Sequence, residues 1–321
     1  MIFDFMVSHI GLVYVFIAVI TWGMSSIGYK LALGTKGTVE RDPITSLAFR
    51  YFIVSLVLTP IMIFFVDIQA LFALNQEIRM NYGIFATLSA LFDIFAHAAY
   101  FMALRHLDSS RVYPFITFQM LLTYPFAILV FNESIPRFLW LSALLIILGV
   151  VSVSKPDHKD KGFENITDEQ KKSHFRKGIM YGLLTGTFFA LFYLSMAMQN
   201  RIVDLGEWEN NYARLIISCI ILWTYLFIKR KHIPKKSHPE YKAQLKSYIT
   251  VGLFACLSAG IGDAVYQMGI AENGAAISIT IASIAPLLNQ LFAILFLKEK
   301  FRPRFLVGVI LIVIANILVV L

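Results

Sequence analysis

The stretch "YPFAILVFNESIPRFLW" at residues 124–140 returns in altered form as "QLFAILFLKEKFRPRFLV" at residues 290–307. Both copies contain the run Phe-Ala-Ile-Leu, and Glu133 of the first copy falls on Glu299 of the second. The same offset aligns residues 82–153 with residues 248–319 without a gap, and it places Tyr100 on Tyr266. The sequence therefore predicts two copies of one structural unit.

The composition indicates that these units lie in a membrane. Of the 321 residues, 58% are hydrophobic and 15% are charged, whereas soluble domains contain about 25% charged residues. Because about 20 apolar residues cross a bilayer, we expect an all-α integral membrane protein with ten transmembrane helices. The expected spans are residues 10–33, 45–66, 82–104, 111–131, 137–154, 178–200, 209–228, 248–271, 275–297 and 303–321.

The repeat divides the ten expected helices into two groups of five. Residues 1–154 form the first five-helix repeat, residues 155–177 a connecting loop rich in basic and acidic residues, and residues 178–321 the second repeat. Since five is odd, the second repeat must enter the membrane with the opposite orientation. The sequence thus predicts an inverted repeat, with a pseudo-twofold axis in the membrane plane.

Two ionisable residues lie near the centre of the third expected span, "LSALFDIFAHAAYFMALRH" at residues 88–106. Each of them costs about 2.5–3.5 kcal/mol on insertion scales. Asp93, His97 and Tyr100 share one helical face, and the repeat places Asp263 on His97. Asp93 and His97 could simply pair with each other across one turn. The ionisable residue at the equivalent position of the second repeat favours instead a shared interior with a function.

Two arginines and two glutamates recur in the same manner. Arg50 corresponds to Arg214 after a two-residue gap, and either could pair with a substrate carboxylate or with an acidic residue of a neighbouring helix. We interpret them as a structural or gating pair. Glu133 and Glu299 fall at short turns beside helix starts, where a carboxylate is favoured by the helix dipole. Their expected role is to shape these turns.

Several motifs resemble those of a known family when they are taken in order along the chain. They are "TWGMSSIGYKLAL" at 21–33, "LAFR" at 47–50, "FNESIPRFLWLSALLIILGVVSV" at 131–153 and "SIAPLLNQLFAIL" at 283–295. The chain resembles a ten-helix, EamA-like member of the drug/metabolite transporter superfamily, although Asn132 and Lys298 replace the usual glycine before the glutamate. The resemblance implies a secondary transporter whose fifth and tenth helices lie at the periphery of a central cavity.

Polar and aromatic residues near the middle of the expected spans are candidates for substrate binding. For the amide and hydroxyl side chains, the alternative is interhelical hydrogen bonding worth about 0.6 kcal/mol on average. The candidates are Trp22, Asp93, His97, Tyr100, Gln119, Thr123, Tyr193, Asp263, Tyr266, Gln267, Asn289 and Gln290.

These residues predict an alternating-access carrier for a small polar metabolite, such as an amino acid or an amine. Asp93 and Asp263 would attract an ammonium group, and its contacts would include the ring faces of Trp22, Tyr100, Tyr193 and Tyr266. His97 titrates near neutral pH and could couple transport to protons. A lipid-moving protein or a channel is the alternative. A membrane-embedded enzyme that uses the Asp93/His97 pair for acid-base chemistry is the least favoured alternative, because nothing in the sequence resembles a nucleophile, a metal site or a phosphate site.

The distribution of basic residues predicts the orientation. Most lysines and arginines outside the expected spans fall in the odd-numbered loops, and the even-numbered loops contain only Arg79, Arg137 and Arg201. The positive-inside rule places the odd loops in the cytoplasm and both termini outside, in the cell membrane, whereas the resemblance implies cytoplasmic termini. The run Lys229–Lys236 is expected to contact anionic lipid headgroups, so the net charge of +8 does not require nucleic acid.

Overall fold

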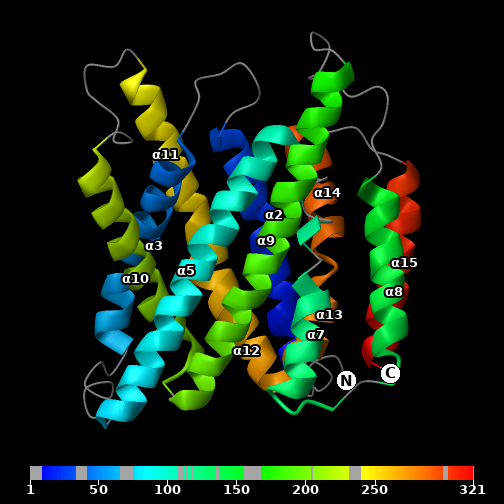
Figure 1. The fold of residues 1–321 in the computed structure, drawn as a ribbon, viewed down its shortest axis with the longest axis horizontal. Helices are drawn as coiled ribbons and strands as arrows, with labels where there is room; N and C mark the ends of the chain where they lie inside the picture. The colour runs from blue at the N-terminus through cyan, green and yellow to red at the C-terminus, as the bar shows by residue number, and fades with distance from the viewer. Residues whose placement is uncertain are drawn as a thin grey trace.

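The computed structural model describes residues 9–33, 42–65, 75–107, 112, 115–116, 119–134, 137–154, 168–203, 205–230, 240–298 and 303–320, and this part of the chain is helical (Figure 1). The helices are α2 (Ile10–Leu33), α3 (Pro43–Phe65), α5 (Gln76–His106), α7 (Gln119–Leu129), α8 (Leu139–Ser154), α9 (Asp168–Ile202), α10 (Glu207–Lys229), α11 (Tyr241–Ala255), α12 (Asp263–Asn273), α13 (Ala275–Ala282), α14 (Ala285–Leu297) and α15 (Pro303–Val320), and a π-helix, η1 (Cys256–Gly262), joins α11 to α12.

Seven helical stretches among the described residues are long and apolar enough to cross a membrane. They are Ile10–Leu33, Pro43–Phe64, Gln76–His106, Lys172–Ile202, Glu207–Lys229, Tyr241–Asn273 and Ala275–Leu297. Shorter apolar segments lie in α8 and α15, and α7 has 11 residues. The all-helical membrane fold is therefore confirmed, whereas the count of ten spans stays a prediction.

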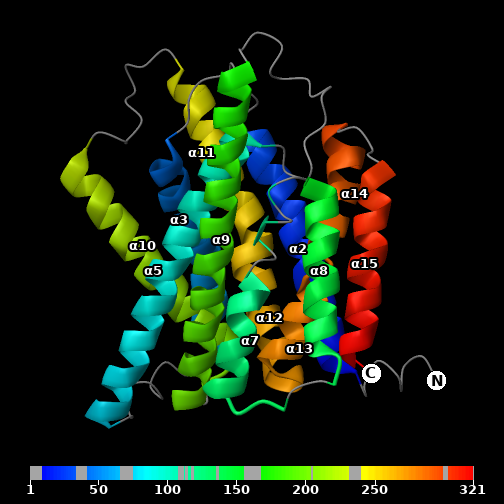
Figure 2. The same cartoon turned by 45° about the vertical axis from the view of Figure 1, so that its right-hand side comes forward.

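Corresponding helices of the two halves run in opposite directions. In Figure 1, α5 rises from the lower end of the molecule to the upper end, and α11, η1 and α12, which align with it in sequence, descend. Figure 2 shows the same opposition between α8, which rises, and α15, which descends. Opposed directions in equivalent helices are the arrangement expected of an inverted repeat.

Helices of the first and second halves interleave around the centre. Helix α2 packs against α11, α12 and α14, helix α3 against α10 and α11, and helix α5 against α9. The buried core accordingly combines Tyr51 and Phe101 of the first half with Phe192 and Met196 of the second. The centre of the molecule is therefore an interface between the two halves.

Helices α8 and α15 form a separate pair at the edge of the molecule (Figure 1). They approach closely because Gly149 has no side chain: a Cβ at this position would lie 2.8 Å from the backbone oxygen of Gly308. The pair exposes large apolar side chains, such as Leu144 and Ile310, as is suitable for contact with lipid chains. The fifth and tenth expected helices thus lie at the periphery, as the resemblance implies.

The connecting segment between the halves is partly helical. Helix α9 begins at Asp168, so residues 168–177 of the predicted loop belong to a helix that continues into the sixth expected span. The rest of this loop, residues 155–167, lies outside the described residues.

Candidate functional site

Four buried charges meet where the halves join. Arg50 on α3 and Asp93 on α5 come from the first half, and Arg214 on α10 and Asp263 on α12 come from the second. Arg214 contacts Asp93 Oδ2 through Nη1, and its Nη2 lies 3.1 Å from Asp263 Oδ2. One guanidinium therefore bridges the carboxylates of both halves. Burying an ion costs several kcal/mol, so such groups stay charged only when their partners are close.

The carboxylate of Asp263 is fully engaged by neighbouring donors. Its Oδ1 accepts hydrogen bonds from Trp22 Nε1 at 3.0 Å and from Tyr193 Oη at 3.1 Å, while Oδ2 binds Arg214. The ring of Tyr266 packs against both aromatic donors, with centroids 5.0 Å from Trp22 and 4.8 Å from Tyr193. An aromatic wall thus fixes the position of this acid.

His97 forms the local pair with Asp93 that the one-turn spacing suggested. Its Nδ1 lies 2.7 Å from Asp93 Oδ1, and the edge of its ring meets Phe189 at a centroid distance of 4.9 Å. His97 also lines the central cavity. His97 therefore both pairs with Asp93 and lines the cavity, so the two interpretations of this residue are compatible.

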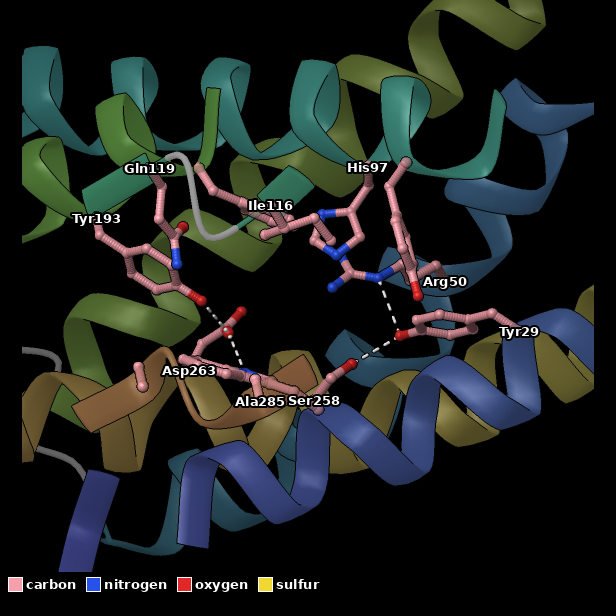
Figure 3. A pocket seen from close by; sticks show the side chains of 13 residues that line it. Tyr29, Arg50, His97, Ile116, Gln119, Tyr193, Ser258, Asp263 and Ala285 are labelled. Atoms are coloured by element: carbon pink, nitrogen blue, oxygen red, sulfur yellow. Dashed lines mark hydrogen bonds between the residues drawn. The ribbon is translucent and has the colours of Figure 1, made fainter. Parts of the chain in front are cut away.

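Arg50 differs from Arg214 in how its donors are used. Its Nε donates to Tyr29 Oη at 3.3 Å, and Tyr29 Oη forms a hydrogen bond of 2.6 Å with Ser258 Oγ. Nη1 lies 3.7 Å from Asp93 Oδ2, and neither Nη1 nor Nη2 has a hydrogen-bond partner among the described residues. Figure 3 shows the guanidinium pointing toward the centre of the cavity, beside His97.

A small cavity of about 50 Å³ lies next to this charge cluster. This volume is the space open to the centre of a water-sized sphere, of which one water molecule needs about 10–15 Å³. The cavity therefore has room for only a few waters in this conformation. Six of the predicted binding residues line it, namely Trp22, His97, Tyr100, Gln119, Tyr193 and Asp263. The remaining lining residues are Tyr29, Arg50, Ile116, Phe189, Ser258, Ala282 and Ala285.

The π-helix η1 positions Asp263. It ends at Gly262, directly before the acid, and Asn211 Nδ2 donates to two of its carbonyls, Ala259 at 2.8 Å and Gly260 at 3.2 Å. Glycine at 262 lets helix α2 come close, since a Cβ there would lie 2.9 Å from Trp22 Nε1. Short π-helical segments occur frequently at functional sites. The aligned segment of α5 is a regular α-helix, so the two halves differ here.

A second interruption also lies in the wall of the cavity, and Figure 3 shows Ala285 beside Ser258. Helix α13 ends at Ala282 and helix α14 begins at Ala285, and both of these residues line the cavity. Pro286 occupies the first turn of α14, where a missing N–H is tolerated. Discontinuous helices beside a central site are a recurring feature of secondary transporters.

Six predicted binding residues lie outside the cavity wall. Asp93 belongs to the charge cluster behind it, and Thr123 donates to the Gln119 carbonyl of its own helix at 3.0 Å. All six side chains are buried between helices, as interhelical hydrogen bonding would also require. The set is Asp93, Thr123, Tyr266, Gln267, Asn289 and Gln290.

Glu133, between α7 and α8, contacts a helix of the other half. Its carboxylate accepts hydrogen bonds from the backbone N–H groups of Ala275 at 2.7 Å and Ala276 at 3.0 Å, the first residues of α13. This is a helix N-terminal cap supplied from a distant part of the chain. Glu299, its predicted counterpart, lies outside the described residues.

Sequence reasoning did not place Tyr29 and Ser258 in the cavity wall. Tyr29 follows Trp22 by seven residues and therefore shares its helical face, a spacing that could have identified it. Ser258 lies within η1, and no pattern in the sequence indicates that segment. The sequence identified Arg50 as a structural or gating residue, but it could not show that Nη1 and Nη2 lack hydrogen-bond partners, because this depends on tertiary contacts.

Comparisons with known proteins agree with the repeat and the fold. The model of the EamA-like transporter family matches residues 9–155 and again residues 176–321, which confirms the internal repeat. A solved protein crystal structure superposes with a TM-score of 0.64 and 14% sequence identity, covering 96% of this chain and 95% of its own. At this identity the likeness shows a shared fold alone. A search of curated proteins found no significant match.

Proposed function

Because this chain belongs to the EamA-like transporter family of membrane transporters, we propose that it is a secondary carrier for a small polar metabolite, an amino acid or an amine. The observation that carries this proposal is the cavity at the junction of the two halves, with Arg50 and His97 from the first half and Asp263 from the second in its wall. A polar cavity at a repeat interface is where secondary transporters bind their substrates.

Alternating access would arise from rocking of one inverted five-helix repeat, residues 1–154, against the other, residues 178–321. Arg214 joins Asp93 and Asp263 across the junction, so these contacts must rearrange whenever the halves move apart. The interruptions at η1 and between α13 and α14 offer places for helices to bend. Because the cavity is small, a substrate could enter it only after the halves have moved apart.

Proton coupling through His97 is part of the proposal. The imidazole lies between the Asp93 carboxylate and the cavity, so a proton taken up there would change the charge that a substrate meets. Histidine is the side chain whose ordinary titration range includes neutral pH.

The proposed location is the cell membrane, with the odd-numbered loops in the cytoplasm and both termini outside. The described helix ends that flank these loops lie together at the upper end in Figure 1. That end carries Lys229 and Arg230 at the close of α10 and Lys242 and Lys246 at the start of α11. These cations support the proposed contact of Lys229–Lys236 with anionic headgroups; residues 231–236 lie outside the described part.

Counterflow in proteoliposomes tests the carrier function. Vesicles preloaded with a mixture of amino acids and amines should accumulate a labelled member of the mixture, with saturable kinetics. Asp263→Asn should lower this accumulation, whereas Leu144→Ala, on the lipid-facing side of α8, should not. Absence of accumulation for every compound, or single-channel currents in place of saturation, would contradict a carrier.

A further inference from the structure

We propose that Arg50 is the anchor for a carboxylate of the transported molecule, so that the substrate is a zwitterionic amino acid and not a simple amine. The inference rests on the proposed carrier function and narrows its substrate class. It reverses the expectation that Asp93 and Asp263 hold an ammonium group.

The two acidic residues have little capacity left for a substrate. Asp263 accepts from Trp22, Tyr193 and Arg214. Asp93 Oδ2 contacts Arg214, whereas Oδ1 lies 2.7 Å from His97 Nδ1 but accepts no hydrogen bond among the described residues. Asp93 does not line the cavity, and an ammonium group at Asp263 would compete with three buried donors. Removing one partner of a buried ion pair is strongly unfavourable, so binding of an amine at these acids is disfavoured.

Arg50, in contrast, has donors that are still open to a substrate. It is fully buried, yet its Nη1 and Nη2 have no hydrogen-bond partner in the part of the chain that the structure describes. Nη1 comes no closer than 3.7 Å to Asp93, so this contact leaves the terminal donors open. Buried donors without acceptors are costly, and more so when they are charged. A ligand oxygen would remove that cost.

The shape of these donors matches a carboxylate. A guanidinium offers parallel N–H groups that bind both oxygens of a planar anion. Nε is already occupied by Tyr29 and the ring of Tyr51 stacks against the group, with a distance of 4.8 Å from Arg50 Cζ to the ring centroid. The Nη pair thus remains as the open edge, and it faces the cavity (Figure 3).

The opposite end of the cavity suits the amino group of the same molecule. Figure 3 shows Gln119 across the cavity from Arg50, and its buried Oε1 has no hydrogen-bond partner among the described residues. The rings of Trp22 and Tyr193 line the same wall and can face a cation. Donors at one end and an acceptor at the other match a zwitterion.

Charge balance points to the same class. Arg50 and Arg214 offset Asp93 and Asp263, so the cluster is neutral when His97 is neutral. A zwitterion preserves this neutrality, whereas a simple carboxylate adds one negative charge to a poorly solvated site. We therefore expect amino acids to bind best, their deaminated acids less well, and their decarboxylated amines least.

The test uses matched probes on the wild-type protein, each differing from the next by one group. L-leucine, 4-methylpentanoate and 3-methylbutylamine form one such set, and equivalent sets are made from each of the other amino acids. Thermal unfolding measures binding, since a ligand of the folded state raises the unfolding temperature, and proteoliposome counterflow measures transport. Stabilisation and transport by at least one amino acid, in preference to its amine, is the expected result.

Two variants then assign the binding group. Arg50→Gln should weaken binding of the preferred carboxylate about 10- to 100-fold, and Arg50→Lys, which keeps the charge without the paired donors, should fall between. If Arg50→Gln does not fold, the wild-type probe sets and Arg50→Lys decide alone. An amine that binds better than its parent amino acid, or unchanged carboxylate affinity in Arg50→Gln, overturns the inference while the carrier function stands. Absence of transport for every class refutes both.

Discussion

Replacing Arg214 with glutamine removes the cation that joins the two halves of the molecule. In the native protein its Nη1 contacts Asp93 and its Nη2 lies 3.1 Å from Asp263, while its guanidinium carbon lies 4.7 Å from the centroid of the Phe192 ring. Glutamine is shorter and uncharged, so it cannot replace both contacts. Asp263 then keeps only the neutral donors Trp22 and Tyr193.

The expected loss follows from leaving a buried carboxylate without its cation, which costs about 3–5 kcal/mol. Asp93 is the less affected acid, because Arg50 at 3.7 Å and His97 at 2.7 Å remain beside it. Asp263→Asn should cost less, about 1–2 kcal/mol, because the amide oxygen can still accept hydrogen bonds and Arg214 keeps Asp93. The two single losses are thus expected to be unequal.

A double-mutant cycle measures the interaction itself. In Arg214→Gln/Asp263→Asn the acid is no longer charged, so the combined loss should fall short of the sum of the single losses by about 1–3 kcal/mol. Reversible unfolding in mixed micelles, titrated with a denaturing detergent, gives the four free energies. Additivity within about 0.5 kcal/mol, or a loss below about 1 kcal/mol for Arg214→Gln, would refute a central ion pair between the halves.

Three further expectations concern other parts of the site. Gly262→Ala should destabilise the protein by about 1–3 kcal/mol and slow transport, since the new methyl would clash with Thr21 Oγ1, its nearest neighbour, and lie 2.9 Å from Trp22 Nε1. Gly260→Ala should be nearly silent, because the nearest neighbour of its methyl lies at 3.6 Å, and equal effects would contradict this account of η1. Glu133→Ala should accelerate backbone hydrogen exchange at the start of α13 by removing its two acceptors, and unchanged exchange would show that the cap is dispensable. His97→Gln should make counterflow insensitive to an imposed proton gradient, and a wild-type protein already insensitive to it would exclude coupling at this residue.

The sequence predicts the helical membrane fold well because its physical signal is local. An apolar run long enough to cross a bilayer is recognised without knowledge of its neighbours. The repeat adds long-range information, since it aligns Asp263 with His97 in the sequence. The alignment indicates that both residues face a shared interior between the two halves. The fourth expected span, residues 111–131, stays a prediction, since part of it lies outside the described residues and α7 contains 11 residues.

The use of each charge at the site could not be predicted. Arg50 and Arg214 are equivalent in the repeat, yet the terminal nitrogens of Arg214 contact two carboxylates, whereas those of Arg50 have no hydrogen-bond partner among the described residues. That difference depends on Asp93, which has an alanine as its counterpart in the second half, and on η1, which breaks the symmetry around Asp263. Both are properties of the assembled helices and not of any single segment.

The charge cluster also implies an order of assembly for the nascent chain. Arg50 and Asp93 approach to 3.7 Å within the first half, and Arg214 and Asp263 to 3.1 Å within the second. Each half therefore contributes one cation and one anion to the cluster, and each cation lies near an acid of its own half. The contact between Arg214 and Asp93 can form only after the second half has been synthesised, so the cluster cannot be completed on the first half alone.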